Sequence, residues 1–311
     1  APLLAWLEAK GAPPQRTSLA EFAEGRGLAA PPGGVSKGER LLCVPRAALL
    51  TGASAAASLG PKADGLGEWA CLAAALAAEE AAGPSSAMAP YVAALPIRCG
   101  GVLEWEDGEV RDLLQGSPCQ ADAAGRRESV AGATPELLSA FPSASLSREG
   151  VRRAFGLLFS RLVRLDGLGG ELALVPWADM ANHDPSCGSY LEWDGAAGGV
   201  VLRADRDYAP GAQVYASYGE ESSGALLLSY GFVPPAGSPH EAVEVAVGLQ
   251  ASDPHRDAKA EALRRRGMAD VASFPVRMSG LPKELLRFAA FAATGVERAS
   301  DAERLAAEAF E

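Results

Sequence analysis

Basic charge is scarce in this sequence of 311 residues, which has 28 lysine and arginine residues against 39 aspartate and glutamate residues and a net charge of −11. The basic residues are scattered, so no stripe of them could neutralise a phosphate backbone. Direct binding of nucleic acid is therefore disfavoured.

Long apolar runs are missing as well. The longest, from Trp69 to Ala78, is far shorter than the ~20 residues needed to cross a bilayer, and the first residues lack a signal-peptide pattern. We therefore expect no membrane partner. With 48% hydrophobic and 22% charged residues, the composition is that of a globular protein and excludes a disordered or fibrous chain.

Cysteine is infrequent and irregularly spaced. The five residues are odd in number and form no C-x-C or C-x-x-C pair, so we expect reduced thiols and neither a structural zinc site nor any other metal. They are Cys43, Cys71, Cys99, Cys119 and Cys187.

Isoleucine and asparagine occur once each, as Ile97 and Asn182. Asn182 stands directly before His183, one of three histidines, and five of the six tyrosines follow it within a short stretch. Because asparagine is absent from the rest of the sequence, its presence at position 182 is informative. We therefore expect the chemistry of the protein near Asn182.

The periodicity predicts an α+β protein that begins with a β-rich unit. Residues 1–50 contain a short helix at Leu3 to Leu7 and strands over 24–30 and 38–45, each after a glycine-rich turn. Residues 51–150 change character and are predicted to be a helical insertion, with helices over 68–82 and 135–141.

The β-rich unit resumes over residues 151–235. The apolar residues between Val151 and Leu162 recur at the spacing of one helix face and predict a helix that ends near Gly167. Short strands are expected after it, over 172–176, 190–193, 200–203 and 213–215. Residues 236–311 are predicted to be a separate helical lobe, with one strand over 243–249 and helices over 255–266, 282–293 and 300–310.

Three motifs carry the functional signal: Leu174–His183 (LVPWADMANH), Gly211–Gly219 (GAQVYASYG) and Leu226–Val233 (LLLSYGFV). Their order and spacing resemble the SET-domain protein methyltransferases of the Rubisco large-subunit methyltransferase class. The resemblance covers nearly the whole chain. Within that class, Phe159–Leu165 and Ser222–Gly224 are most similar to SET proteins of the plant and algal plastid transcriptionally active chromosome.

The resemblance implies a split SET domain with small β-sheets and a knot-like core, in which the segment ending at His183 lies beneath the loop of Tyr218. Asn182 and Tyr218 are then expected to reach one cofactor-sized pocket. Relatives of this class often continue beyond the position of Glu311, so we expect the C-terminal, substrate-binding-like lobe to be incomplete.

The implied activity is that of a protein-lysine N-methyltransferase in the chloroplast stroma, with S-adenosyl-L-methionine as cofactor and a protein with a target lysine as partner. Methyl transfer to an amine is an in-line displacement that needs an uncharged amine and a desolvated methyl group. It requires no metal, which agrees with a tyrosine-rich region that has no metal-ligand cluster.

By the resemblance, Tyr218 is the catalytic phenol beside the transferring methyl group, and it also contacts the cofactor. Asn182 and His183 would bind the polar groups and the adenine of the cofactor. A core role is the alternative for the Tyr218 and His183 rings. Tyr230 and Phe232 either wall the substrate channel or belong to the core.

The remaining cofactor contacts come from two other segments. Glu24, Gly25 and Arg26 match the segment whose backbone cradles the cofactor. Arg161 matches the arginine that faces the methionine carboxylate, its alternative being an exposed helix arginine. Ser160 and Asp179 match positions whose carbonyl oxygens border the methyl group.

Two other functions stay open. The chain could be a SET-fold structural subunit of a large plastid transcription complex that binds the cofactor with little or no catalysis. Alternatively, the methylated residue could be histidine, because some members of the class modify imidazole.

Overall fold

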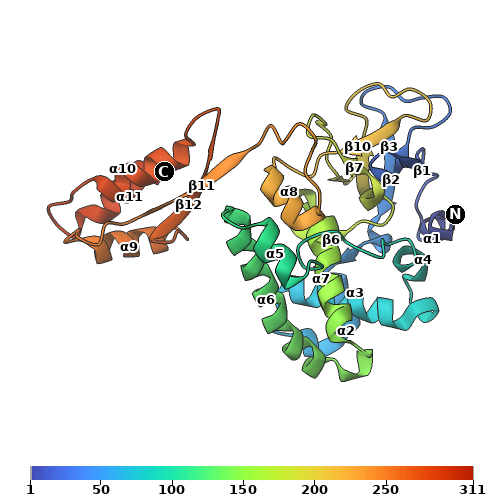
Figure 1. Cartoon of the computed structure of the whole chain (residues 1–311), viewed down its shortest axis with the longest axis horizontal. Coiled ribbons are helices and arrows are strands. Elements are labelled where there is room, and N and C mark those ends of the chain that lie inside the picture. Colours follow the sequence, from blue (N-terminus) through green and yellow to red (C-terminus); the bar gives the residue numbers. More distant parts are fainter. Residues whose placement is uncertain (1, 311) are drawn as a thin grey trace. The chain divides into compact units, whose positions relative to one another are not determined.

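The computed structural model describes residues 2–310 and divides into two compact units, Ala1–Ala236 and Gly237–Glu311 (Figure 1). The first unit contains all three sequence motifs. Within residues 2–310, no helix combines the length and apolar character needed to cross a membrane.

Three small sheets build the first unit, and each joins strands from both sides of the helical insertion. The first has the order β1 (Ser18–Phe22), β2 (Gly25–Ala29), β10 (Gln213–Ala216), β7 (Asn182–His183). Strands β1 and β2 form an antiparallel hairpin, β10 adds antiparallel to β2, and β7 runs parallel to β10. Segments nearly 200 residues apart thus meet in one sheet.

The other two sheets repeat this plan with antiparallel pairing throughout. The second has the order β3 (Arg40–Pro45), β9 (Gly199–Arg203), β8 (Glu192–Asp194). The third has the order β4 (Leu50–Thr51), β6 (Glu171–Leu174), β5 (Val163–Leu165). The predicted strands over residues 24–45 and 172–215 correspond to β2, β3, β6, β8, β9 and β10.

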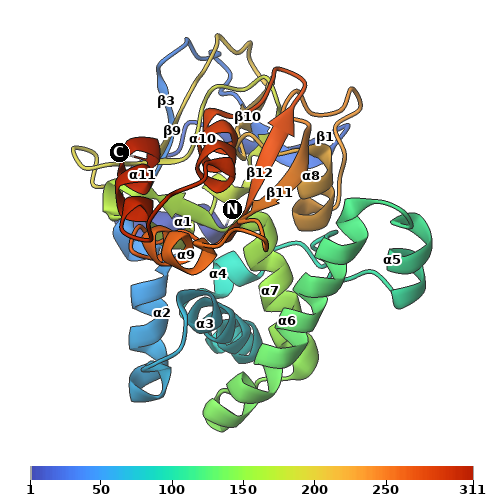
Figure 2. The ribbon, with the colours of Figure 1, turned by 90° about the vertical axis from the view of Figure 1, so that its left-hand side faces the viewer.

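Helices fill the segment between the two groups of strands, and α1 (Pro2–Ala9) precedes the first sheet. Helix α3 (Glu68–Ala82) is buried on every side from Cys71 to Ala77, because its alanines let neighbouring helices approach closely. Helix α7 (Arg148–Arg161) packs against α3 and α6 (Figure 2). The other helices are α2 (Gly52–Leu59), α4 (Ala89–Val92), α5 (Asp107–Leu113) and α6 (Pro118–Ala140).

Two predicted helix boundaries are wrong. Helix α6 begins at Pro118, with Ser117 as its N-cap, so the predicted helix over 135–141 is only its last part. Residues 118–134 lack a clear apolar stripe, and Pro135 suggested a start instead of an interior position. Helix α7 ends at Arg161 and not near Gly167, because residues 163–165 pair with β6.

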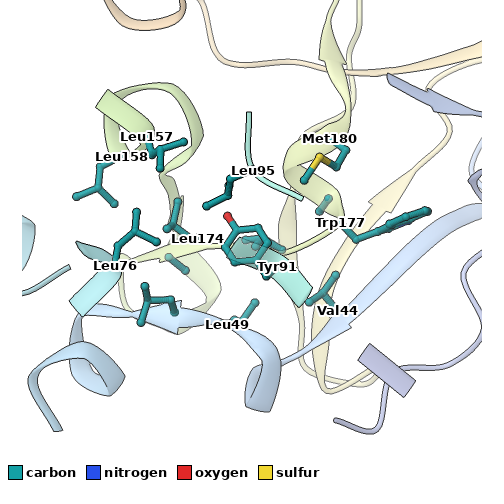
Figure 3. Packing of buried hydrophobic residues seen from close by; sticks show 14 of the residues in the cluster. Val44, Leu49, Leu76, Tyr91, Leu95, Leu157, Leu158, Leu174, Trp177 and Met180 are labelled. Atoms are coloured by element: carbon teal, nitrogen blue, oxygen red, sulfur yellow. The ribbon is translucent and has the colours of Figure 1, made fainter. Parts of the chain in front are cut away.

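One apolar core runs from the first helix to the first sheet, and the insertion supplies much of it. Figure 3 shows part of this packing, with Tyr91 of α4 in the middle and Leu76, Leu95 and Leu174 around it. The insertion is therefore an integral part of the first unit.

The second unit has a core of its own, centred on Phe274, Phe288 and Phe291. Its helices are α9 (Arg256–Arg264), α10 (Lys283–Ala293) and α11 (Asp301–Phe310), and its strands β11 (Ala242–Gly248) and β12 (Val271–Arg277) are antiparallel. The sequence predicted β11 and the helices but not β12. Proline ordinarily argues against a strand, but in a two-stranded sheet Pro275 can lie on an outer edge without losing a ladder bond.

Gly231 offers a test of the contact between the insertion and α8 (Ser223–Tyr230). It ends α8 with φ +79°, and a Cβ there would overlap the carbonyl oxygen of Gly100. Gly231→Ala should therefore lower the free energy of unfolding by more than about 3 kcal/mol, combining left-handed strain with steric overlap.

Gly211→Ala is the matched control, because Gly211 has φ +72° and no atom within 4 Å of an added Cβ. It should cost only about 1 kcal/mol in urea unfolding. Equal losses for the two variants would contradict the packing contact.

Candidate functional site

A cavity of about 530 Å³ opens where the end of α7, the 3₁₀ turn Ala178–Met180 and the segment after β10 come together. Its walls include Ser160, Arg161, Asp179, Tyr218 and Tyr230. The structure therefore brings five of the predicted site residues into one cavity, although they come from four separate parts of the sequence.

Tyr218 is held in place by both its backbone and its phenol. Its N–H donates to Nδ1 of His183 (3.1 Å), and its hydroxyl donates to the carbonyl oxygen of Ala181 (2.8 Å). Its ring stacks on His183 at 5.1 Å and on Tyr230 at 4.5 Å between centroids. The parallel pairing of β7 with β10 brings these residues together.

Burial raises the pKa of Tyr218 to about 12, because the nearby charge of Arg161 offsets only part of the desolvation. Burial also raises the pKa of Tyr230. Both phenols therefore keep their protons at neutral pH. Tyr218 can orient a substrate through its hydroxyl but cannot act as a phenolate base.

Arg161 and Asp179 form a buried ion pair in the cavity wall. Nη1 of Arg161 lies 3.2 Å from Oδ2 of Asp179 and donates to its carbonyl oxygen at 2.6 Å. The side chains are only 16% and 1% exposed, so Arg161 is not an exposed helix arginine like Arg164, which is 69% exposed. Burial raises the pKa of Asp179, although Arg161 and Tyr91 oppose the shift.

A strained turn places Asp179 opposite Arg161. Trp177, just before the 3₁₀ turn, has φ +75°, which a bulky residue rarely adopts. Its buried ring and the hydrogen bond from its indole N–H to Oγ1 of Thr17 (3.0 Å) hold this conformation. Strain of this kind persists where the surrounding packing enforces it, often at functional sites.

Two polar atoms of the pair have no protein partner. Among the described residues, Nε of Arg161 and Oδ1 of Asp179 are buried without a hydrogen bond. Buried polar groups are usually satisfied, since an unmet one costs about 1–3 kcal/mol. The pair thus leaves one donor and one acceptor without a hydrogen-bond partner, and both of its residues line the cavity.

The hydroxyl of Ser160 makes hydrogen bonds within its own helix. It donates to the carbonyl oxygens of Gly156 (3.0 Å) and Leu157 (3.2 Å) within α7. The hydroxyl proton of Ser160 is therefore engaged within the helix, and the contact of its carbonyl oxygen with the methyl group stays a prediction.

Asn182 lies beside the segment of Glu24, Gly25 and Arg26 and not in the cavity wall. Its Nδ2 donates to the carbonyl oxygen of Arg26 (3.4 Å), and a Cβ on Gly27 would come within 2.9 Å of that nitrogen. Glu24 is exposed in the turn between β1 and β2. The predicted cofactor residues thus form two groups, one in the cavity and one along β2.

Asn182 is not among the residues that line this cavity, although its neighbour Ala181 is, so the expectation that Asn182 and Tyr218 reach one cofactor-sized pocket stays a prediction. Successive side chains of a strand point to opposite faces. His183 turns toward Tyr218, so its neighbour Asn182 turns toward β2. The backbone of Ala181, which accepts the Tyr218 hydroxyl bond, lies between the two.

Phe232 also lies beside the cavity wall and not in it. Its ring is 6.3 Å from His183 and 6.2 Å from Tyr230. Of the two predicted channel residues, only Tyr230 contacts the cavity.

Sequence reasoning missed Tyr91, whose hydroxyl donates to Oδ2 of Asp179 (2.7 Å). Tyr91 is completely buried. It is the one tyrosine outside the cluster after Asn182, and this isolation is the only signal in the sequence that could have drawn attention to it.

Within residues 2–310, no group of three or more histidine, cysteine, aspartate or glutamate side chains is placed to hold a metal ion. The five cysteines are all free thiols.

The structure is similar to solved SET-domain structures along its whole length. The SET domain of LSMT bound to lysine and AdoHcy matches 99% of this chain and 74% of that chain, with a TM-score of 0.81 and 24% identity. Rubisco LSMT bound to AdoMet gives a TM-score of 0.79 with the same coverage and 23% identity. The fold is that of the LSMT SET domain. The predicted α+β split SET fold is thereby confirmed.

Sequence comparisons agree with this fold. The family model described as Rubisco LSMT substrate-binding matches residues 250–311. Actin-histidine N-methyltransferase of Homo sapiens is 30% identical over 312 residues, covering 92% of this chain and 51% of that protein. The dog protein of the same name is 30% identical over 227 residues, covering 67% of this chain and 38% of that protein. The chain spans about half the length of these relatives or less. None of them is a plastid chromosome protein, so that narrower resemblance stays a prediction.

The buried ion pair can be tested by Arg161→Met. This change leaves the Asp179 carboxylate buried without its cation, so the free energy of unfolding should fall by roughly 3 kcal/mol at neutral pH. Arg164→Met removes a partner from an exposed pair and should cost less than about 0.5 kcal/mol.

The loss in Arg161→Met should depend on pH. Without Arg161, the pKa of Asp179 rises further above its ordinary 3.8, so the folded variant holds a proton that the unfolded chain releases. Its stability is then full below that value and falls as pH rises through the folded pKa. Urea unfolding at pH 4 and pH 8 should show the smaller loss at pH 4, and a pH-independent loss would contradict the buried pair.

Proposed function

We propose that this protein is an S-adenosylmethionine-dependent protein methyltransferase that acts on lysine. The observation that carries the proposal is the cavity lined by Arg161, Asp179 and the protonated phenol of Tyr218, in which one donor of Arg161 and one acceptor of Asp179 have no hydrogen-bond partner. The match to LSMT structures with AdoMet or AdoHcy supports the same cofactor.

The open atoms fit the amino-acid end of S-adenosylmethionine. That end carries a carboxylate and an ammonium group on one carbon, which complement Nε of Arg161 and Oδ1 of Asp179. The segment of Glu24 to Arg26 and the amide of Asn182 would then hold the adenosine end. When bound, the cofactor supplies a methyl group on a positively charged sulfur.

The residues of the chain orient and desolvate the reaction. Tyr218 keeps its hydroxyl proton on the Ala181 carbonyl, so the phenol oxygen can accept a hydrogen bond from an incoming amine. The stacked faces of Tyr218 and Tyr230 shield the site from water and favour a cationic centre. The amine must arrive deprotonated, since neither phenol can take its proton at neutral pH.

The walls of the cavity support lysine as the target. Leu162, Ala178 and Trp193 line it, and aliphatic and aromatic surfaces suit a four-carbon stem with a terminal nitrogen. The names of the actin-histidine relatives point to imidazole instead. Matched peptides with lysine or histidine at one position would decide between them, and transfer to the histidine peptide alone would overturn lysine.

The protein substrate itself is unidentified. Location in the plastid and membership of a plastid transcription complex stay predictions from the sequence, and import of the labelled precursor into isolated chloroplasts would test the first.

Cofactor binding is the first test. We expect a Kd in the micromolar range, roughly −8 kcal/mol, by calorimetry with S-adenosylmethionine. Asn182→Ala should abolish binding, because the polar groups it meets would be buried unpaired. Gln250→Ala removes an exposed amide of the second unit and should change nothing. Absence of binding heat and of a thermal shift in the wild type would refute the proposal.

Tyr218→Phe separates catalysis from a structural role. Loss of one hydroxyl leaves the packing almost unchanged, so the fold and most cofactor affinity should survive. The rate of methyl transfer should nevertheless fall about 10²-fold, or about 2.7 kcal/mol, because the phenol orients the amine mainly in the transition state.

The measurement is methyl incorporation from labelled cofactor into stromal proteins, for wild type and variant. If the wild type binds the cofactor but labels no protein, the SET-fold structural subunit becomes the better account.

A further inference from the structure

We propose that Tyr91, from the helical insertion, is a positioning residue that sets the cofactor's amino-acid subsite by orienting Asp179 and, through it, Arg161. The inference rests on the proposed function, since it concerns how the same site holds S-adenosylmethionine. It assigns the insertion a direct part in cofactor binding.

The hydroxyl of Tyr91 fixes which oxygen of Asp179 stays open. It donates to Oδ2 at 2.7 Å, the same oxygen that lies 3.2 Å from Nη1 of Arg161. Both neighbours thus engage Oδ2, and Oδ1 is left without a partner among the described residues. Without the tyrosine hydroxyl, the carboxylate could rotate and present either oxygen to Arg161.

The orientation of Arg161 follows from that of Asp179. Nη1 is held by the carboxylate and by the Asp179 carbonyl oxygen (2.6 Å). Because a guanidinium is planar, fixing Nη1 on two acceptors also fixes the direction of Nε. The contacts that set the direction of Nε are thus the same contacts that leave Oδ1 of Asp179 without a partner among the described residues.

Tyr91 is well suited to this role because its ring is packed on all sides. Its side chain is fully buried in the apolar core (Figure 3), and burial raises the pKa of its phenol well above the ordinary value, so it remains a donor. The same segment also contacts Arg26, whose Nη2 donates to the carbonyl oxygen of Ala94 (2.5 Å). One short stretch of the insertion thus touches both groups of predicted cofactor residues.

The test compares two ligands that differ at the amino-acid end. S-adenosylmethionine carries this end, and 5′-methylthioadenosine lacks it while keeping the adenosine and the sulfur. Tyr91→Phe should weaken binding of S-adenosylmethionine about tenfold by calorimetry, the effect of losing one hydrogen bond to a charged group. Binding of methylthioadenosine should stay within about twofold.

Tyr208→Phe is the matched control. Tyr208 is also buried, and its hydroxyl donates to Oδ1 of Asp205 (2.6 Å), which pairs with Arg206. It is a second Tyr–Asp–Arg cluster, and none of its members lines the cavity. This variant should bind both ligands like the wild type.

A double-mutant cycle tests whether Tyr91 acts through Asp179. Asp179→Asn should itself weaken S-adenosylmethionine selectively, and adding Tyr91→Phe to it should have little further effect, because the two residues act as one unit. If Tyr91→Phe fails to fold by circular dichroism, Asp179→Asn alone carries the test. Equal binding of S-adenosylmethionine by Asp179→Asn and the wild type would then overturn the proposal.

Further outcomes separate a failure of the Tyr91 role from a failure of the proposed function. If the wild type binds S-adenosylmethionine and Tyr91→Phe binds it equally well, or loses both ligands alike, the positioning role is wrong while the proposed function stands. If the wild type binds neither ligand, the proposed function fails, and the role of Tyr91 fails with it.

Discussion

The buried pair of Arg161 and Asp179 is the interaction on which the site depends. Removing two charges from water costs several kcal/mol per ion, and the attraction between them repays this only when further hydrogen bonds complete the geometry. Three separate segments meet that demand: α7 supplies the arginine, the strained turn after Trp177 the aspartate, and α4 the hydroxyl of Tyr91. The pair is nonetheless incomplete, since Nε and Oδ1 lack partners among the described residues. A ligand that offers one acceptor and one donor would satisfy both atoms.

The split arrangement of the first unit explains how a long insertion can serve the site without interrupting it. Each of the three sheets closes with strands from both sides of the insertion, so the sheets fix the two ends of that segment. The parallel pairing of β7 with β10 then brings Ala181 and Tyr218 together. The insertion contributes its own core packing and, at Tyr91, a polar contact that no strand provides.

The sequence predicted those parts of the fold that short motifs and local periodicity encode. Asn182, His183 and Tyr218 were singled out because they stand in recognisable motifs, and β2, β3 and α3 were predicted because glycine turns or apolar runs mark them. The contact of Tyr91 with Asp179 joins positions 88 residues apart, and nothing local to Tyr91 reveals it. The start of α6 and the strand β12 were not predicted, because proline usually ends or interrupts a helix or a strand. In the folded chain, tertiary packing accommodates the prolines at 135 and 275 inside these elements. Asn182 and His183 point to opposite faces because side chains alternate along β7. The spacing of the motifs does not show which of the two turns toward Tyr218.

The protonation states in the cavity restrict what chemistry it can perform. Burial holds the protons on Tyr218 and Tyr230, and the carboxylate of Asp179 in the same cavity wall is already engaged by Arg161 and Tyr91. None of these three groups is both free and basic enough to remove a proton from an ammonium ion, whose ordinary pKa is about 10.4. For the proposed transfer of a methyl group to an amine, such a site would have to select the minor neutral form of the amine from solution and orient it. The proposed rate advantage would then come from alignment and exclusion of water, which makes the position of each hydroxyl more important than its acidity.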